Sequence, residues 1–341
     1  MPPALVHPGP LTPTNVGNQK RASLMLSYFQ AIVIGLMQGV TELFPVSSLG
    51  HSVLVPAWIG GSWNTLVTQS STGDSGSSPY LAFIVALHVA TALALLAFFW
   101  RDWVRIIRGF FRSLRPTLAE RRIVARDSDE RLAWLLVIGT IPVGITGLAL
   151  EHTFRTLFAK PLAAAIFLTV NGLMLFAGEW LRRRAPIDEE DREVRVPDVA
   201  APVRTAAQPT IRPNRRLATL HYGEAAVIGL FQTLALLAGV SRSGITMVGG
   251  LARGLSHRDA ARFSFLLATP VIFAAGVLKL PSLAGPAGSG IHGQVLVGAL
   301  AAGVAAYVSV KWLTRWFETR TLTPFAIYSL IVGIISVVHF A

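Results

Sequence analysis

Six long apolar segments constrain the fold of this chain more than any other feature. A transmembrane helix needs about 20 mostly apolar residues. The segments that meet this requirement are 80–100, 132–150, 161–180, 263–280, 294–312 and 323–341. Because 52% of the residues are hydrophobic and only 14% are charged, the composition is that of a membrane protein. We therefore expect an all-α polytopic membrane protein with six transmembrane helices.

Two further apolar stretches, 30–58 and 224–250, are interrupted by polar and turn-forming residues. Pro45 disfavours helical geometry at the residue before it, so a helix should stop there. In the second stretch, Gly239 and Gly244 bracket three polar residues in the sequence AGVSRSG. Backbone groups released from a helix cannot face lipid, because they would lack hydrogen-bond partners. Both stretches are therefore predicted to form re-entrant helical hairpins inside the protein.

The distribution of arginine predicts the orientation in the membrane. Loop 101–131 contains nine arginines against five acidic residues, and loop 182–222 begins with three consecutive arginines. The positive-inside rule places both loops in the cytoplasm. Loops 61–79 and 281–293 contain no lysine or arginine and are expected outside. This arrangement puts both termini outside, with the first hairpin entering from the outer face and the second from the cytoplasm.

The remaining compositional features narrow the functional classes. The formal net charge is +12, but the arginines cluster in loops beside apolar segments, so membrane topology explains them and nucleic-acid binding is not expected. The chain has no cysteine, which excludes disulfides and thiolate metal sites. A metal would have to be bound by oxygen or imidazole ligands.

The two interrupted stretches are related by an internal repeat. Residues 30–53 align with 224–247 at a constant offset of 194, with ten identities in 24 positions, among them glycines, a glutamine and a serine. Each half would then be one hairpin followed by three spans, and an odd number of spans inverts the second half relative to the first. Inverted repeats place paired broken helices near the membrane midplane, where a binding site is expected.

The repeat sets the expected domain organisation, which has four parts. These are a disordered tail at 1–27, a first repeat at 28–181, a cytoplasmic linker at 182–222 and a second repeat at 223–341.

The first hairpin carries groups suited to acid–base, nucleophilic or metal chemistry. Gln38 and Glu42 are four residues apart and so share a helix face, where they could donate oxygens to Mg²⁺ or Ca²⁺. After the break, Ser47, Ser48 and His51 could serve as helix cap, hydroxyl nucleophile and general base. An ionisable group at this depth is a functional candidate by default, although a protonated Glu42 bonded to a neighbouring helix is an alternative.

The second hairpin carries groups suited to binding an anion. Ser241, Arg242, Ser243 and Thr246 begin its second half, where exposed N–H groups and the helix dipole favour negative charge. The guanidinium of Arg242 adds a fork of donors that matches phosphate. The alternative is a structural ion pair between Arg242 and Glu42 without a substrate. Outside the hairpins, His88 lies within an apolar span and is expected to be a hydrogen-bonded core histidine.

The motifs of the two hairpins resemble those of a known family. QGVTELFPVSSLGH is similar to the (E/Q)xxxE plus PVSSxGH signature of the undecaprenyl-diphosphate phosphatases of the bacitracin-resistance type, and AGVSRSGIT resembles their PGxSRSxxT motif. The similarity continues through FSFLLATP and TPFAIYSLIVG. Ala238 stands where that motif usually has proline, and Gln38 is the neutral option of the first motif, which leaves Glu42 as the only acid of a metal site.

The resemblance implies an enzyme of the bacterial inner membrane. Such an enzyme hydrolyses undecaprenyl diphosphate to the monophosphate with the help of a divalent cation, recycles the lipid carrier of cell-wall synthesis and confers resistance to bacitracin. Carried over by motif position, the catalytic residues would be Glu42, Ser48, His51 and Arg242. The diphosphate would bind Ser47, Ser241, Arg242, Ser243 and Thr246, and the metal would bind Gln38 and Glu42.

Other functions and several details stay open at this stage. A polyprenyl-phosphate flippase, an anion transporter or an anion channel could share the inverted-repeat architecture, but none of these needs a general base. The topology predicts a site that opens to the periplasmic face. The sequence does not decide between attack by serine and attack by water, nor whether the chain forms a homodimer.

Overall fold

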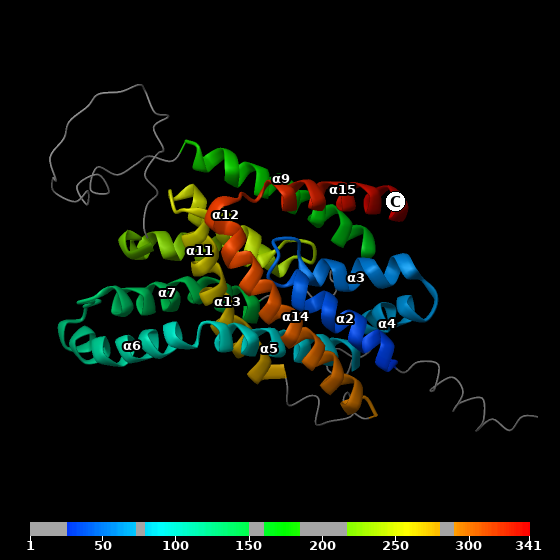
Figure 1. The fold of residues 1–341 in the computed structure, drawn as a ribbon, viewed down its shortest axis with the longest axis horizontal. Helices are drawn as coiled ribbons and strands as arrows, with labels where there is room; N and C mark the ends of the chain where they lie inside the picture. Colours follow the sequence, from blue (N-terminus) through cyan, green and yellow to red (C-terminus); the bar gives the residue numbers. More distant parts are fainter. Residues whose placement is uncertain (1–25, 73–78, 150–159, 185–216, 280–289) are drawn as a thin grey trace, which may run out of the picture.

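The computed structural model describes residues 26–72, 79–149, 160–184, 217–279 and 290–341. The elements within these ranges are all helices, which confirms the all-α class (Figure 1). They are α2 (Tyr28–Thr41), α3 (Ser48–Ile59), α4 (Gly61–Thr72), α5 (Pro79–Phe98), α6 (Trp100–Glu120), α7 (Ser128–Ala149), α9 (Pro161–Arg182), η1 (Leu217–Thr219), α11 (Tyr222–Thr233), η2 (Leu234–Leu236), α12 (Arg242–Ala252), α13 (His257–Lys279), α14 (His292–Thr319) and α15 (Thr323–Phe340). Most of the predicted tail and most of the predicted linker lie outside the described residues; at the end of the tail, Leu26 is buried and Ser27 is the N-cap of α2.

Each of the six apolar segments forms a helix. In the described part of the chain, α7, α9, α13, α14 and α15 are long and apolar enough to cross a membrane. Helix α5 meets the same test only together with α6, which follows it after a bend of 85°. The structure therefore contains five to six candidate spans, as a polytopic membrane protein requires.

Two helices lie where only loops were expected. Helix α4 follows the first hairpin, and α6 occupies most of the arginine-rich loop. In α6, Ile106 and Gly109 are buried on one side while arginines such as Arg112 are exposed. Arg112 Nε donates to the buried Glu130 at 2.5 Å, which ties α6 to the first turn of α7. Helix α6 carries too many charged residues to be a transmembrane span by itself, although its apolar residues recur at helical spacing.

Both interrupted stretches form pairs of short helices, as predicted. Helix α2 ends at Thr41, and a turn precedes α3, whose N-cap is Ser47. Helix α11 continues into η2 and breaks before α12, whose N-cap is Ser241. Each capping hydroxyl accepts a hydrogen bond from the amide three residues later, which satisfies a free N–H of the new helix. Gly244 belongs to the first turn of α12 and not to the break.

The two breaks pack directly against each other. A Cβ at Gly50 would lie 2.9 Å from Gly239 Cα, and a Cβ at Gly244 would lie 3.2 Å from Pro45 Cβ. The offset of 194 relates Pro45 to Gly239 and Gly50 to Gly244, so these two contacts correspond under the repeat. Figure 1 shows α3 and α4 toward one end of the molecule and α11 toward the other. These contacts agree with two halves related by a twofold operation, and the inverted membrane topology stays a prediction.

Candidate active site

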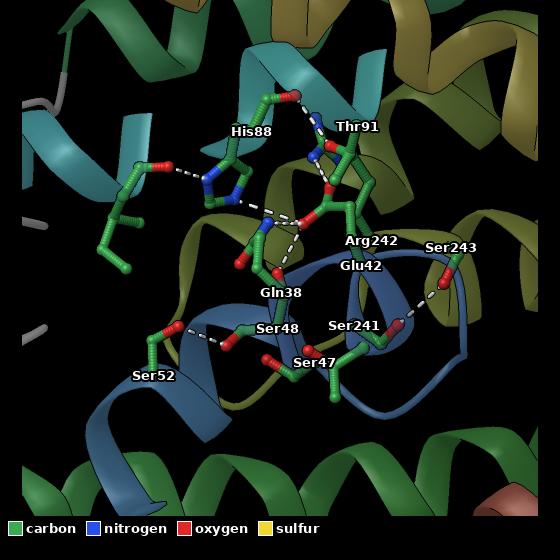
Figure 2. Close-up of polar contacts among 12 residues, drawn as sticks. Gln38, Glu42, Ser47, Ser48, Ser52, His88, Thr91, Ser241, Arg242 and Ser243 are labelled. Atoms are coloured by element: carbon green, nitrogen blue, oxygen red, sulfur yellow. Dashed lines mark hydrogen bonds and ion pairs between the residues drawn. The ribbon is translucent and has the colours of Figure 1, made fainter. Parts of the chain in front are cut away.

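Glu42 is the centre of a buried polar cluster at the first break (Figure 2). Its Oε2 accepts hydrogen bonds from Gln38 Nε2 at 3.0 Å and from Ser48 Oγ at 2.5 Å. Its Oε1 forms an ion pair with Nη2 of Arg242 from the second hairpin. Three predicted site residues therefore contact the carboxylate of a fourth, Glu42. The charge of Arg242 and the donors of Gln38 and Ser48 together compensate for the loss of hydration at this buried carboxylate.

The helix starts place Ser48 and Arg242 toward this carboxylate. Each is the first residue of its helix and follows a capping serine, Ser47 or Ser241. Ser47 has a φ of 70°, which is strained for a residue with a side chain. Its hydroxyl accepts from the amide of Gly239 at 3.2 Å as well as from its own helix. Ser47 therefore links the two hairpins and sets the direction in which α3 begins.

His88 of α5 is a member of the cluster that the sequence reading assigned to the core. Its Nε2 lies 3.2 Å from Glu42 Oε2, and its Nδ1 lies 2.8 Å from the carbonyl oxygen of Ile84. Because a carbonyl can only accept, Nδ1 carries a proton, and Nε2 faces the carboxylate. His88 is thus positioned to exchange a proton with Glu42. A histidine in the middle of an apolar span was the only sequence signal for it.

Both ring nitrogens of His51 contact groups other than the Ser48 hydroxyl, and its predicted role as general base stays a prediction. Its Nδ1 is 2.7 Å from the carbonyl oxygen of Ser47, and its Nε2 is 2.8 Å from the hydroxyl of Tyr328 in α15. The proton of Ser48 points instead to Glu42. Ser48 and His51 do lie three residues apart in the same helix, α3. This spacing does not show which groups of neighbouring helices form hydrogen bonds with the ring nitrogens of His51. In this geometry Glu42 is the base nearest to Ser48.

The other predicted anion-binding residues line or underlie the second hairpin's helix start. Ser241 Oγ and Ser243 Oγ are 3.0 Å apart, and both side chains are buried. Ser243 Oγ also donates to the carbonyl of Phe44 at 3.3 Å. Thr246 is buried, and its Oγ1 has no partner within the described residues. Of these three, Ser241 also lines the cavity described below.

Asn171 of α9 joins the two breaks and was missed by the sequence reading. Its Nδ2 donates to the carbonyl of Pro45 at 3.0 Å, and its Oδ1 accepts from the amide of Ser241 at 2.9 Å. Nδ2 also contacts Ser329 Oγ at 3.2 Å. The side chain is fully buried. Asn171 therefore satisfies backbone groups that each hairpin exposes where its helix breaks.

A cavity of about 310 Å³ adjoins the polar cluster. Its polar lining comes from Glu42, Ser47, Ser48, His88, Gln232, Ser241 and Arg242. Its apolar walls come from α5, α7 and α13 and include Ile84, Val143 and Ala275. Charged and hydroxyl groups at one side and apolar walls at the other match a ligand that combines an anionic head with a hydrocarbon chain.

The protein supplies only part of a metal site. No group of three or more histidine, aspartate or glutamate side chains in the described ranges could hold a metal ion. Gln38 Oε1 is buried without a hydrogen-bond partner among the described residues, and it lies on the side chain whose amide nitrogen contacts Glu42. Gln38, Glu42 and Ser48 could therefore offer three oxygens, and a cation with six or more ligands would need further oxygens from its substrate.

Comparison with known proteins places this site in a family. The model of the bacitracin resistance protein BacA matches residues 31–335, which cover nearly all of both hairpins and of the six apolar segments. The chain belongs to the BacA family. Undecaprenyl-diphosphatase 2 of Frankia alni is 60% identical to this BacA-family chain over 93% of it and 98% of the relative. The undecaprenyl-diphosphatase of Mycolicibacterium paratuberculosis is also 60% identical, with the same coverage of each chain.

More distant members resemble the chain over the same length. Undecaprenyl-diphosphatase 2 of Chromobacterium violaceum is 40% identical over 91% of this chain and 98% of its own. The BacA-family resemblance inferred from two motifs thus extends over nearly the whole protein.

Proposed function

We propose that this protein hydrolyses undecaprenyl diphosphate to undecaprenyl phosphate and inorganic phosphate, which returns the lipid carrier of cell-wall synthesis to use and confers bacitracin resistance. The relatives named above carry the names of undecaprenyl-diphosphatases. The observation that carries the proposal is the contact of one buried carboxylate, Glu42, with Ser48, His88 and Arg242 beside a cavity with apolar walls. A binding protein or channel has no need for a carboxylate that accepts a hydroxyl proton.

The roles follow from the contacts. Arg242 contacts Glu42 through one terminal nitrogen, and its planar fork can bind oxygens of the diphosphate as well. The hydroxyl of Ser241 and the start of α12 would complete the anion site, and the hydroxyls of Ser243 and Thr246, which do not line the cavity in this structure, would support that helix start. The apolar walls would hold the first part of the polyprenyl chain while the rest stays in the bilayer.

In the reaction, an oxygen nucleophile attacks the terminal phosphorus, and the bond from that phosphorus to the bridging oxygen breaks. Undecaprenyl phosphate leaves with the bonding electrons. If Ser48 attacks, its proton passes to Glu42, and water then hydrolyses the phosphoserine. If water attacks directly, Ser48 positions it and Glu42 takes its proton. His88, whose Nε2 lies 3.2 Å from the same Glu42 oxygen, can accept that proton in either route.

The two routes differ in one covalent bond. Rapid quenching of enzyme mixed with substrate labelled in the terminal phosphate would leave label on Ser48 only in the serine route. We expect Ser48→Ala to lose all but trace activity in that route. Retention of substantial activity by this variant would exclude serine attack, and label on Ser48 would exclude direct attack by water.

A divalent cation fits the site if it arrives with the diphosphate. Gln38 and Glu42 would hold it together with phosphate oxygens, since the protein alone offers one carboxylate. Bound there, Mg²⁺ or Ca²⁺ would offset charge on the phosphates. The test is phosphate release after removal of divalent ions with a chelator, followed by addition of each metal.

We further propose that the protein lies in the bacterial inner membrane with the cavity open to the periplasm. Residues from the first half of α5 and the last part of α13 line the cavity. Loop 61–79 precedes α5 and loop 281–293 follows α13, and neither contains lysine or arginine. Because the chain has no cysteine, an Ala275→Cys variant offers a single label site in the cavity wall, where Ala275 is exposed. A membrane-impermeant maleimide should label it in intact spheroplasts but should not label the control Arg108→Cys in α6. The reverse pattern would overturn the orientation.

The decisive experiment for the function is phosphate release from undecaprenyl diphosphate by the purified protein in the presence of a divalent cation. Release should depend on Glu42 and Arg242, with Glu42→Gln and Arg242→Ala inactive but folded. Wild-type protein that binds the lipid without releasing phosphate would refute the proposed hydrolysis and favour a transport role.

A further inference from the structure

Gln232, the penultimate residue of α11, has a fully buried side chain with unused hydrogen-bonding capacity. Neither its Nε2 nor its Oε1 has a hydrogen-bond partner within the described residues. An unpaired amide in such a place is unfavourable for the folded protein. Gln232 is among the residues around the cavity that also contains Glu42, Ser48 and Arg242. The placement suggests that the missing partner is a ligand in that cavity.

The repeat indicates what kind of ligand this is. The offset of 194 relates Gln232 to Gln38 and Leu236 to Glu42. In the first half, Gln38 Nε2 donates to the carboxylate of Glu42 at 3.0 Å. In the second half the acid is replaced by Leu236, which also lines the cavity. The second half therefore has an amide donor at Gln232, as the first half has at Gln38, but has no carboxylate at the position of Glu42.

We propose that Gln232 binds the diphosphate of the substrate, with a phosphate oxygen in the place that the Glu42 carboxylate takes beside Gln38. Its Nε2 donates to this oxygen, and its Oε1 accepts from a hydroxyl or water bound to the same phosphate. The substitution of an acid by leucine at position 236 is essential to this role, because a carboxylate there would satisfy the amide and repel phosphate. The inference deepens the proposed function and rests on it.

Gln232→Met tests the proposal, because methionine has a similar length and shape but cannot form these hydrogen bonds. A hydrogen bond to a charged acceptor typically changes binding by about ten- to hundredfold. We expect the KM for undecaprenyl diphosphate to rise by about this factor, with a smaller change in kcat, as for loss of contacts made equally in ground and transition states. Gln232→Glu, which places a negative charge against the phosphate, should raise KM further.

Thermal unfolding separates binding from a structural role. Without ligand, Gln232→Met should unfold at or above the wild-type temperature, because it removes an unpaired buried amide. Inorganic pyrophosphate should stabilise the wild type more than the variant. Gln294→Met, in the first turn of α14, is the matched control and should behave as wild type in both assays. A lower unfolding temperature with unchanged KM would assign Gln232 to the fold and overturn the proposal.

The outcomes also distinguish this inference from the proposed function. Wild-type kinetics in Gln232→Met and Gln232→Glu, measured beside an active wild type, would refute the inference alone. A wild type that releases no phosphate, but whose stabilisation by pyrophosphate depends on Gln232, would refute the phosphatase function and leave the anion-binding role of Gln232 supported.

Discussion

Asn171 allows a quantitative test of how the two broken helices are held together. Leucine has nearly the same shape as asparagine, so Asn171→Leu removes the polar contacts with little change in packing. Three hydrogen bonds are lost, to Pro45, Ser241 and Ser329. Double-mutant cycles in membrane proteins average about 0.6 kcal/mol per side-chain hydrogen bond, which gives about 2 kcal/mol. Two of the three partners are backbone groups at helix breaks, and each one left unpaired costs about 1–3 kcal/mol.

We therefore expect Asn171→Leu to lower the free energy of unfolding by about 2–6 kcal/mol, the range given by two unpaired backbone groups. Reversible unfolding in mixed detergent micelles, followed by tryptophan fluorescence, measures this change. The control is Thr169→Val in the same helix, which removes only a hydrogen bond from Thr169 to the carbonyl of Ala165 one turn earlier and should change stability by less than about 0.5 kcal/mol.

Activity gives a second measure of the same contact. Asn171 connects the hairpin that carries Glu42 and Ser48 to the hairpin that carries Arg242, and a displacement of about 1 Å can reduce a rate by about 100-fold. We expect kcat to fall by one to two orders of magnitude in the folded fraction of Asn171→Leu. Wild-type stability together with a wild-type kcat would refute the view that this side chain sets the relative position of the two breaks.

Three further substitutions test other parts of the site. Gly239→Ala should prevent stable folding, because Gly239 has a φ of 111° and a Cβ there would lie 2.4 Å from the carbonyl oxygen of Ala164. The control is Gly144→Ala, since no atom of a neighbouring helix in the described part of the chain lies within 4 Å of a Cβ at Gly144. Equal unfolding temperatures for the two variants would contradict the reasoning. Arg242→Lys should lower kcat/KM by about 100-fold although the charge is kept, because the planar fork is lost; kinetics within threefold of wild type would show that charge alone suffices. His88→Leu should reduce kcat by about 100-fold and leave the unfolding temperature nearly unchanged, whereas unchanged kcat would remove His88 from the proton path.

The local parts of the site could be predicted from the sequence. The helix spacing of Gln38 and Glu42, the break at Pro45 and the serine caps depend on neighbouring residues, and the structure shows all of them. The contact between Glu42 and Arg242 across 200 positions was accessible through the repeat and through the need of an intramembrane charge for a partner.

The missed parts come from helices that carry no local signal. Asn171 and His88 each stand alone in an apolar segment, and their roles depend on how α9 and α5 pack against the hairpins. The contact of His51 Nε2 with Tyr328 of α15 likewise depends on how the helices pack and has no local signal in the sequence. Helix α6 was predicted as a loop because its many arginines rule out a transmembrane span. The structure shows an amphipathic helix that is buried on one side.

The close approach of the two breaks has a consequence for the path of the lipid. A methyl group on Gly50 would lie 2.9 Å from Gly239 Cα, and a methyl group on Gly239 would lie 2.4 Å from the carbonyl oxygen of Ala164 in α9, so the hairpins are closely packed against each other and against α9. A lipid whose tail is tens of ångströms long must nevertheless reach and leave the cavity. We expect α5 and α7 to separate from α13 to admit it, and cross-linking these walls should then arrest turnover while cross-linking the hairpins should not.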